Sequence, residues 1–378
     1  MNGELKFMMI WLFTLGLMHE GNGQVKENKV VLLMPFCSKL TLANPMHSDI
    51  QLSNLSREYY QGLLIALDSL EQANIAVNLT VLDTENDSMT VVRHLNKQPM
   101  KDAELIIGPV FKSGNKMIGE FVKGRDVFHV SPLMTFSKPD ATDMNTISSN
   151  PYISSYGRLI VKQIKITQPE TDDYTIIVIS DKSSLDKTIT AGIKQAAGKT
   201  TKIKIIDVSK LSELSAALSA TQPKYVVIPS SSEKVVTEFF NSIKDTSLFN
   251  NLSLYGLPQW LDFKNVNYVQ WQQANIHIGT PFYIDYTKEE VRNFIRLYRE
   301  KYFTDPSEAA FKGYDQALVF ITCLNSYHKK MLAKIADFPL PALHTQFNIS
   351  QNLDKGGYQN YYLNWLTMQQ YKLIKLKD

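Results

Sequence analysis

Residues 102–115, which read DAELIIGPVFKSGN, decide the fold. An apolar run of strand length, 104–110, stops at a Gly-Pro pair, and a helical stretch is predicted near 114–123. In an α/β protein such a loop lies at the carboxyl end of a strand, where open sheets bind ligands. Three interpretations follow: a phosphate loop, a loop that holds a nucleophile, or one wall of a binding cleft.

The same strand-and-helix pattern recurs on either side of this stretch. Stretches of helical period follow the first apolar runs, near 55–70, 89–97 and 114–123. This alternation predicts a mostly parallel sheet with helices on both faces. The apolar runs of this first series are 29–36, 78–83, 104–110 and 127–134.

A polar passage at 140–155 interrupts the series, which then begins again. The fold class is therefore α/β, with two similar lobes built around mostly parallel sheets. The second series of apolar runs is 174–180, 202–208, 224–232 and 252–258.

The last section carries strong helix signals and two late strands. Thr287 and Glu290 form a capping-box pattern, and Asp305 is the expected N-cap of a further helix, with Pro306 at its first position. Strands are expected within 345–350 and 360–376.

Residues 1–23 have the pattern of a secretory signal peptide. Lys6 precedes an apolar run at 7–18, and a Gly-Asn-Gly triplet at 21–23 places the expected cleavage before Gln24. Twelve apolar residues are too few to cross a bilayer as a helix. The mature chain is therefore expected to be exported and soluble.

The charge composition argues against nucleic acid and anionic membranes as partners. The 378 residues carry 40 basic and 37 acidic side chains, a net charge of +3 that gives no large field for nucleic acid or an anionic membrane. Cys37 and Cys323 are the two cysteines. Sequence does not tell whether they pair, although two buried small residues are the favoured interpretation.

Motifs for catalysis, nucleotides and metals are weak or missing. GIKQAAGKT at 192–200 has the wrong spacing for a phosphate loop, and Gly198 is better explained as a helix C-cap. DTENDS at 83–88 lacks the turn glycine of a calcium loop and is expected to be a solvated turn. His129 is expected to be a strand histidine satisfied locally. No catalytic residue, cofactor or metal is therefore assigned.

Longer stretches resemble the type I periplasmic binding proteins, which include the leucine/isoleucine/valine-binding and amide-binding proteins. The resemblance covers nearly all of 29–378, and its most specific part is YREKYFTDPSEAAFKGYDQALVF at 298–320. The closest similarity is to a branch from Gram-negative bacteria that is often fused to LysM repeats. The resemblance to the family as a whole also lies in YYQGLLIALDSL, LIIGPV and VSPLMT, whereas LYGLPQWLDF, NIHIGTPFYIDY and a late GG with aromatics resemble the branch.

The resemblance implies three chain crossings between lobes, near 145–150, 281–286 and 340–347, with hinge closure on a ligand. Lobe I would comprise 24–147 and 284–343, and lobe II 148–283 and 344–378.

The resemblance also implies the ligand-binding residues. Lys112 stands where amino-acid binders usually carry Ser or Thr, and Leu133 and Met134 replace small residues. Asp315 is expected only to position a nearby loop. The ligand-binding residues would be Phe111, Lys112, Ser113, Met134 and Thr135 in lobe I, and Asp181, Ser230 and Trp260 in lobe II.

Two functions fit this pattern best. The first is a non-catalytic protein that closes its lobes around a small polar molecule, such as an amino acid, amide or peptide-like ligand, for transport or sensing. Its partner would be an inner-membrane transporter. The second is a cell-envelope regulator on the same fold whose cleft is vestigial and whose surface binds another protein. A hydrolase or transferase ranks third, because no motif places a base beside a nucleophile.

Overall fold

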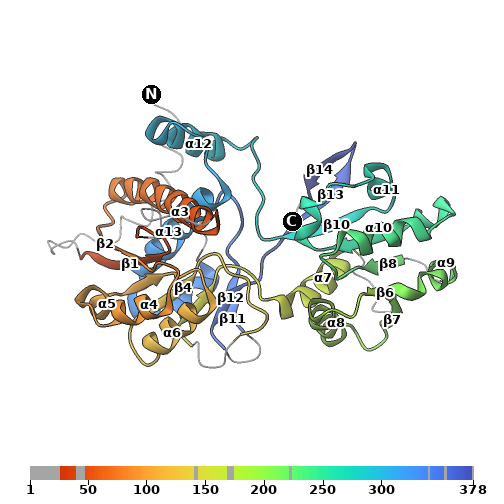
Figure 1. Ribbon diagram of the computed structural model, residues 1–378, viewed down its shortest axis with the longest axis horizontal. Coiled ribbons are helices and arrows are strands. Elements are labelled where there is room, and N and C mark those ends of the chain that lie inside the picture. Colours follow the sequence, from red (N-terminus) through yellow and green to blue (C-terminus); the bar gives the residue numbers. More distant parts are fainter. Residues whose placement is uncertain are drawn as a thin grey trace. The chain divides into compact units, whose positions relative to one another are not determined.

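The structure is a computed structural model that describes residues 26–39, 47–139, 144–167, 174–220, 224–338, 341–352 and 356–376. The expected signal peptide, 1–23, lies outside these residues. The chain divides into two compact α/β units, coloured red to orange and yellow to teal over most of their length in Figure 1. In the described residues, no helix is both long and apolar enough to cross a membrane.

The first unit contains a seven-stranded sheet of order β11-β12-β5-β4-β3-β1-β2. Neighbouring strands are parallel except β11 and β12. The strands are β1 Asn28–Met34, β2 Val77–Asp83, β3 Leu105–Ile107, β4 Phe128–Ser131, β5 Thr146–Ser148, β11 Ile349–Gln351 and β12 Tyr358–Asn360. The helices are α3 His47–Gln72, α4 Ser88–Leu95, α5 Gln98–Asp102, α6 Lys112–Val122, α12 Glu289–Tyr302, α13 Glu308–Tyr327 and α14 Met331–Lys334, with short η4 His328–Lys330 and η5 Ile335–Asp337.

The second unit contains a seven-stranded sheet of order β14-β13-β10-β9-β8-β6-β7. Here β13 is antiparallel to both of its neighbours, and the other pairs are parallel. The strands are β6 Thr175–Ser180, β7 Lys202–Asp207, β8 Lys224–Val227, β9 Leu252–Gly256, β10 Ile276–Thr280, β13 Asn364–Gln369 and β14 Lys372–Lys375. The helices are α7 Ile153–Thr167, α8 Ser184–Ala196, α9 Leu214–Ser219, α10 Glu233–Ser242 and α11 Tyr268–Gln273, with short η1 Val208–Glu213, η2 Thr246–Phe249 and η3 Pro258–Asp262.

Both units therefore have the same doubly wound core. In each, the first strand lies between the second and the third, and the fourth and fifth continue the sheet. The prediction of two similar α/β lobes is confirmed. In such sheets the loops at the carboxyl ends of the parallel strands bind ligands.

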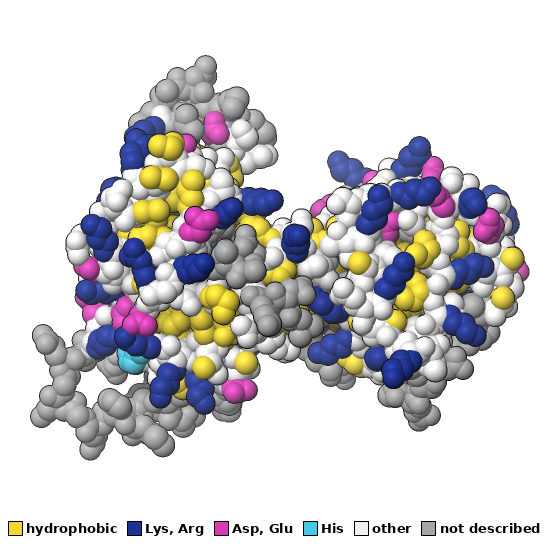
Figure 2. Space-filling model, turned by 90° about the horizontal axis from the view of Figure 1, so that it is seen from below, with side chains coloured by type: hydrophobic (Ala, Val, Ile, Leu, Met, Phe, Trp, Pro, Cys, Tyr) yellow, Lys and Arg dark blue, Asp and Glu magenta, His cyan; other side chains and the backbone are white. Residues whose placement is uncertain are grey.

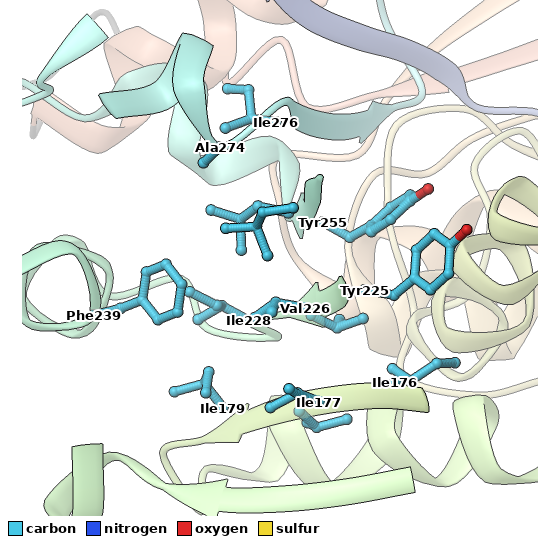
Figure 3. Close-up of a cluster of buried hydrophobic side chains, with 14 of the residues drawn as sticks. Ile176, Ile177, Ile179, Tyr225, Val226, Ile228, Phe239, Tyr255, Ala274 and Ile276 are labelled. Carbon is cyan, nitrogen blue, oxygen red and sulfur yellow. The ribbon is translucent and has the colours of Figure 1, made fainter. Parts of the chain in front are cut away.

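The core of the second unit shows why its strands read as continuous apolar runs. One cluster of buried side chains contains Ile176 and Ile177 of β6, Val226 of β8, Tyr255 of β9 and Phe239 of α10 (Figure 3). Because helices cover both faces, both sets of alternating side chains are apolar.

Each unit has one helix pair that packs closely at glycine. A β-carbon on Gly62 or Gly313 would lie 1.9 or 2.0 Å from a carbonyl oxygen of the facing helix, α13 or α3. A β-carbon on Gly157 of α7 would lie 2.1 Å from the Ile189 carbonyl oxygen of α8. Figure 1 shows α3 beside α13 and α7 beside α8.

The first two crossings lie close to the expected positions, and the third does not. The chain passes between units after Asn150 and after Tyr283, and the final crossing follows Asn360 rather than lying within 340–347. The reason is that β11 and β12 extend the first sheet, with β12 parallel to β5. A short segment, Thr135–Lys138, also belongs to the second unit.

Several expected helix caps are wrong by one or two residues. α13 begins at Glu308 and its N-cap is Ser307, because the Asp305 carboxylate accepts a hydrogen bond from Arg299 Nε at 2.5 Å. Thr287 does not cap α12, since its hydroxyl donates to Asp285 Oδ1. The C-cap of α8 is Ala197 rather than Gly198.

Candidate functional site

The loop from β3 to α6 is held in one conformation by two residues. Gly108 has φ 92°, and a β-carbon there would lie 2.0 Å from the Leu33 carbonyl oxygen, so only glycine fits. The Asn115 amide donates to the carbonyl oxygens of Pro109 at 2.6 Å and Phe111 at 2.9 Å. The loop is therefore a rigid support for the residues that follow it.

The start of α6 presents backbone amides and two exposed side chains. Phe111 is the N-cap residue, is half-buried against the core and makes no side-chain cap. Lys112 and Ser113 are exposed, and the Ser113 hydroxyl lies 2.9 Å from that of Ser88 at the start of α4. Uncapped amides at a helix start favour a negatively charged group.

Met134 lies beside this loop, and Thr135 does not belong to the same unit. The Asn115 amide lies 3.8 Å from the Met134 sulfur, so Asn115 links the two loops that follow β3 and β4. Thr135 is exposed and lies in the segment Thr135–Lys138, which belongs to the second unit. The first unit thus brings together four of its five predicted residues.

In the second unit, the three predicted residues bond to one another. The Ser230 hydroxyl donates to Asp181 Oδ2 at 2.5 Å, and the Trp260 indole N–H donates to the Ser230 carbonyl oxygen at 2.8 Å. Burial raises the pKa of Asp181, but hydrogen bonds from Ser183 and Ser230 outweigh it and hold the pKa below its usual value. Asp181 is therefore ionised at neutral pH.

Trp260, which the resemblance places among the ligand-binding residues, does not offer its ring to a ligand. The side chain is 0% exposed and packs beside Phe263 and Trp271. Gly256 makes room for it, since a β-carbon there would lie 2.5 Å from the indole ring. Its part is to hold the loop that carries Ser230.

Sequence reasoning missed the residues that fix these loops. Asp186 is buried and accepts hydrogen bonds from Ser180 Oγ, Lys182 N and Thr190 Oγ1. The signal for it is Ser183-x-x-Asp186, a helix-start pattern whose Ser183 hydroxyl accepts from the Asp186 amide at 3.1 Å. Asn115 has no comparable local signal.

The acidic loop after β2 is a turn, as expected. Asp83 accepts hydrogen bonds from the amides of Cys37, Ser38 and Glu85, and Asp87 caps α4. Their oxygens are thus engaged with the backbone. Across the described part of the chain, no group of three or more His, Cys, Asp or Glu side chains is placed to hold a metal.

The remaining candidates for chemistry are structural. His129 Nε2 lies 3.0 Å from the Gly108 carbonyl oxygen and its Nδ1 lies 3.1 Å from Thr146 Oγ1, which confirms a locally satisfied strand histidine. Asp315 accepts the amides of Leu343 and His344 and pairs with the His344 ring, so it positions that loop. Both cysteines are buried, and no disulfide joins them.

The charged surface agrees with the small net charge. On the face that Figure 2 shows, Lys and Arg side chains are spread over both units with Asp and Glu among them. That face carries no single large basic patch of the kind that attracts a polyanion.

Solved structures of similar fold match nearly the whole chain. An ABC transporter substrate-binding protein from Desulfitobacterium hafniense, in complex with Leu, matches with a TM-score of 0.55 and 16% identity over 93% of this chain and 100% of that one. The chain has the type I periplasmic binding protein fold. A branched-chain amino acid ABC transporter periplasmic ligand-binding protein from Burkholderia xenovorans matches with a TM-score of 0.58 and 12% identity, over 93% and 95% of the chains.

A third match has a different role. The C-domain of LpoA from Haemophilus influenzae, a regulator of PBP1A, matches with a TM-score of 0.57 and 14% identity, over 92% of this chain and 99% of that one. A scan against protein-family models gives no match, and neither does a search of curated proteins. At these identities the likeness establishes the fold.

Proposed function

We propose that the chain is an exported, periplasmic, non-catalytic protein that binds a small polar molecule, such as an amino acid, an amide or a peptide-like compound, for transport or sensing. The proposal includes closure of the two units on the ligand. Its support is the fold, together with loops at the carboxyl ends of parallel strands in both units.

The observation that carries the proposal is the start of α6. Its first amides have no side-chain cap, and the exposed Lys112 and Ser113 stand beside them. Asn115 and Gly108 fix the loop, so these donors keep their direction without a ligand. Preformed donors of this kind suit the carboxylate or carbonyl end of a small polar molecule.

Lys112, Leu133 and Met134 argue for a ligand other than an ordinary branched-chain amino acid. Lys112 adds a positive charge, and the larger Leu133 and Met134 leave less room than small residues would. A ligand with a negative charge and a small body fits this edge of the unit best.

A second candidate function is a cell-envelope regulator with a vestigial cleft, and the hydrogen bonds among the predicted ligand-binding residues of the second unit favour it. Asp181, Ser230 and Trp260 satisfy one another, which leaves fewer of their polar atoms for a ligand. The LpoA domain shows that this fold also occurs in a regulator. The two candidates differ in whether the isolated protein binds a small molecule.

Thermal denaturation in the presence of free amino acids, short aliphatic amides and dipeptides tests the first candidate. A compound at a hundred times its dissociation constant adds about 2.7 kcal/mol to the free energy of unfolding. We expect at least one compound to raise the melting temperature. We expect Lys112→Glu to abolish that rise, because it places a carboxylate beside the anion.

Lys116→Glu is the matched control, since Lys116 is exposed on the same helix one turn later. It should keep the wild-type rise. If Lys112→Glu also keeps it, the start of α6 is not the binding site. A panel without any rise would favour the regulator.

A further inference from the structure

A hollow of about 240 Å³ opens on the second unit between α10 and the segment that leads into α11. All of its lining residues belong to this unit, so it does not depend on the first. Asp181, Ser230 and Trp260 do not line it. It is therefore a separate feature from the loops described above.

The floor of the hollow is apolar and aromatic. Phe240 and Trp271 are almost fully buried, and Phe263 is half-buried and stacks on Trp260 with ring centroids 6.2 Å apart. Val236 and Val266 complete the floor. Phe263 and Val266 are half-buried, so a ligand meets their exposed carbon atoms, and the buried rings of Phe240 and Trp271 pack beside them.

The rim carries amide side chains. Asn241, Asn265 and Gln270 make no side-chain hydrogen bond to the rest of the described chain. Asn267 uses its oxygen to accept the amides of Val269 and Gln270, at 3.1 and 3.2 Å, so its N–H groups remain as donors. The rim thus presents amide donors and acceptors around a carbon floor.

One carboxylate completes the rim. Glu233 Oε1 accepts a hydrogen bond from the backbone N–H of Asn265 at 2.6 Å, which fixes the Glu233 side chain and leaves its second oxygen as an acceptor. The described residues that line the hollow include no Lys or Arg. An anion would therefore meet a negative charge with no cation to offset it.

We propose that this hollow binds a sugar, that is, one uncharged polyhydroxylated ring. A hydroxyl group both donates and accepts, so several on one ring pair with a rim that mixes amides with a carboxylate. The C–H groups of the ring pack on the aromatic floor. The hollow is smaller than the roughly 300–1,000 Å³ of sites for drug-sized ligands, which suits a single ring.

Saturation-transfer NMR on the whole protein tests this proposal with glucose, galactose and N-acetylglucosamine as probes, and with N-acetyl-leucinamide as a peptide mimic. We expect at least one sugar to bind with a dissociation constant on the order of 1 mM, because one ring buries little area. The double variant Asn241→Ala/Gln270→Ala should weaken it at least about fivefold, since two hydrogen bonds are lost.

The control is Asn250→Ala/Gln273→Ala, which removes the same two residue types from another part of the same unit. It should bind the sugar like the wild type, and circular dichroism should show all three proteins folded. Three results would overturn the proposal: no sugar binds, the rim variant binds the sugar as well as the control does, or the rim substitutions weaken binding of the peptide mimic and not of the sugars. None of these outcomes bears on the α6 site in the first unit.

Discussion

At the scale of single residues, each unit contains a buried histidine whose pKa differs from that of a free side chain. His129 in β4 and His277 in β10 are enclosed in the two sheets, 0% and 4% exposed. Burial lowers the pKa of His129 to about 3 and that of His277 to about 4. Both rings are therefore neutral in the folded protein over the physiological range.

Because of these two histidines, we expect the free energy of unfolding to fall in acid. In the unfolded chain a histidine protonates near pH 6.5, whereas the buried rings stay neutral, so the unfolded state binds more protons as the pH falls. Stability should be constant above about pH 6.5 and fall below it, by at most about 1.4 kcal/mol per pH unit for each histidine.

Urea unfolding between pH 7 and pH 4.5 measures this dependence. We expect His129→Asn to be less stable at pH 7 and to show a shallower pH dependence than the wild type. His328→Asn is the control, because His328 is exposed and receives the same new residue. Equal slopes for His129→Asn and the wild type would contradict the role of His129.

Residue-scale prediction from sequence succeeded where the signal is local. Ser113 and Lys112 follow a Gly-Pro exit from a strand, and their exposure at a helix start follows from that order alone. The bond between Ser230 and Asp181 joins residues 49 positions apart, and Asn115 acts through carbonyl groups that its loop brings near. No periodicity or composition encodes such contacts.

At the scale of elements, strands and helices were predicted better than their ends. The third strand was expected over 104–110 and is Leu105–Ile107, because Gly108 with φ 92° leaves the sheet geometry. Ser307 replaced Asp305 as a helix cap because Arg299 binds the Asp305 carboxylate. The sequence pattern does not show that a capping side chain has another hydrogen-bond partner.

The close packing of α3 against α13 gives a prediction at this scale. Gly313→Ala places a methyl group 2.0 Å from the Tyr59 carbonyl oxygen, so the helices must separate. We expect a loss of roughly 1–3 kcal/mol in the free energy of unfolding, despite a gain of about 1 kcal/mol in helix propensity. Urea unfolding followed by far-ultraviolet circular dichroism measures it.

Ser326→Ala is the control for this change, since Ser326 is exposed on the same helix and receives the same new residue. It should change stability by less than about 0.5 kcal/mol. If Gly313→Ala were as stable as this control, the glycine would not be required for helix contact.

At the scale of the whole molecule, the same strand order occurs in both units. Two successive series of apolar runs predicted two doubly wound units, and the structure has them. The final crossing was misplaced because β11 and β12 have three residues each, too few to show a period. Which unit a short strand joins depends on pairing with β5, some 200 positions earlier.

The proposed function requires that the isolated chain bind a small polar molecule without chemical turnover. Native mass spectrometry of the purified protein, before and after mild denaturation and refolding, tests it most directly. We expect the purified protein to retain a small molecule, which refolding removes and which binds again, unchanged in mass, when added back. A protein that carries no small molecule, and whose melting temperature no compound of the panel raises, would contradict it.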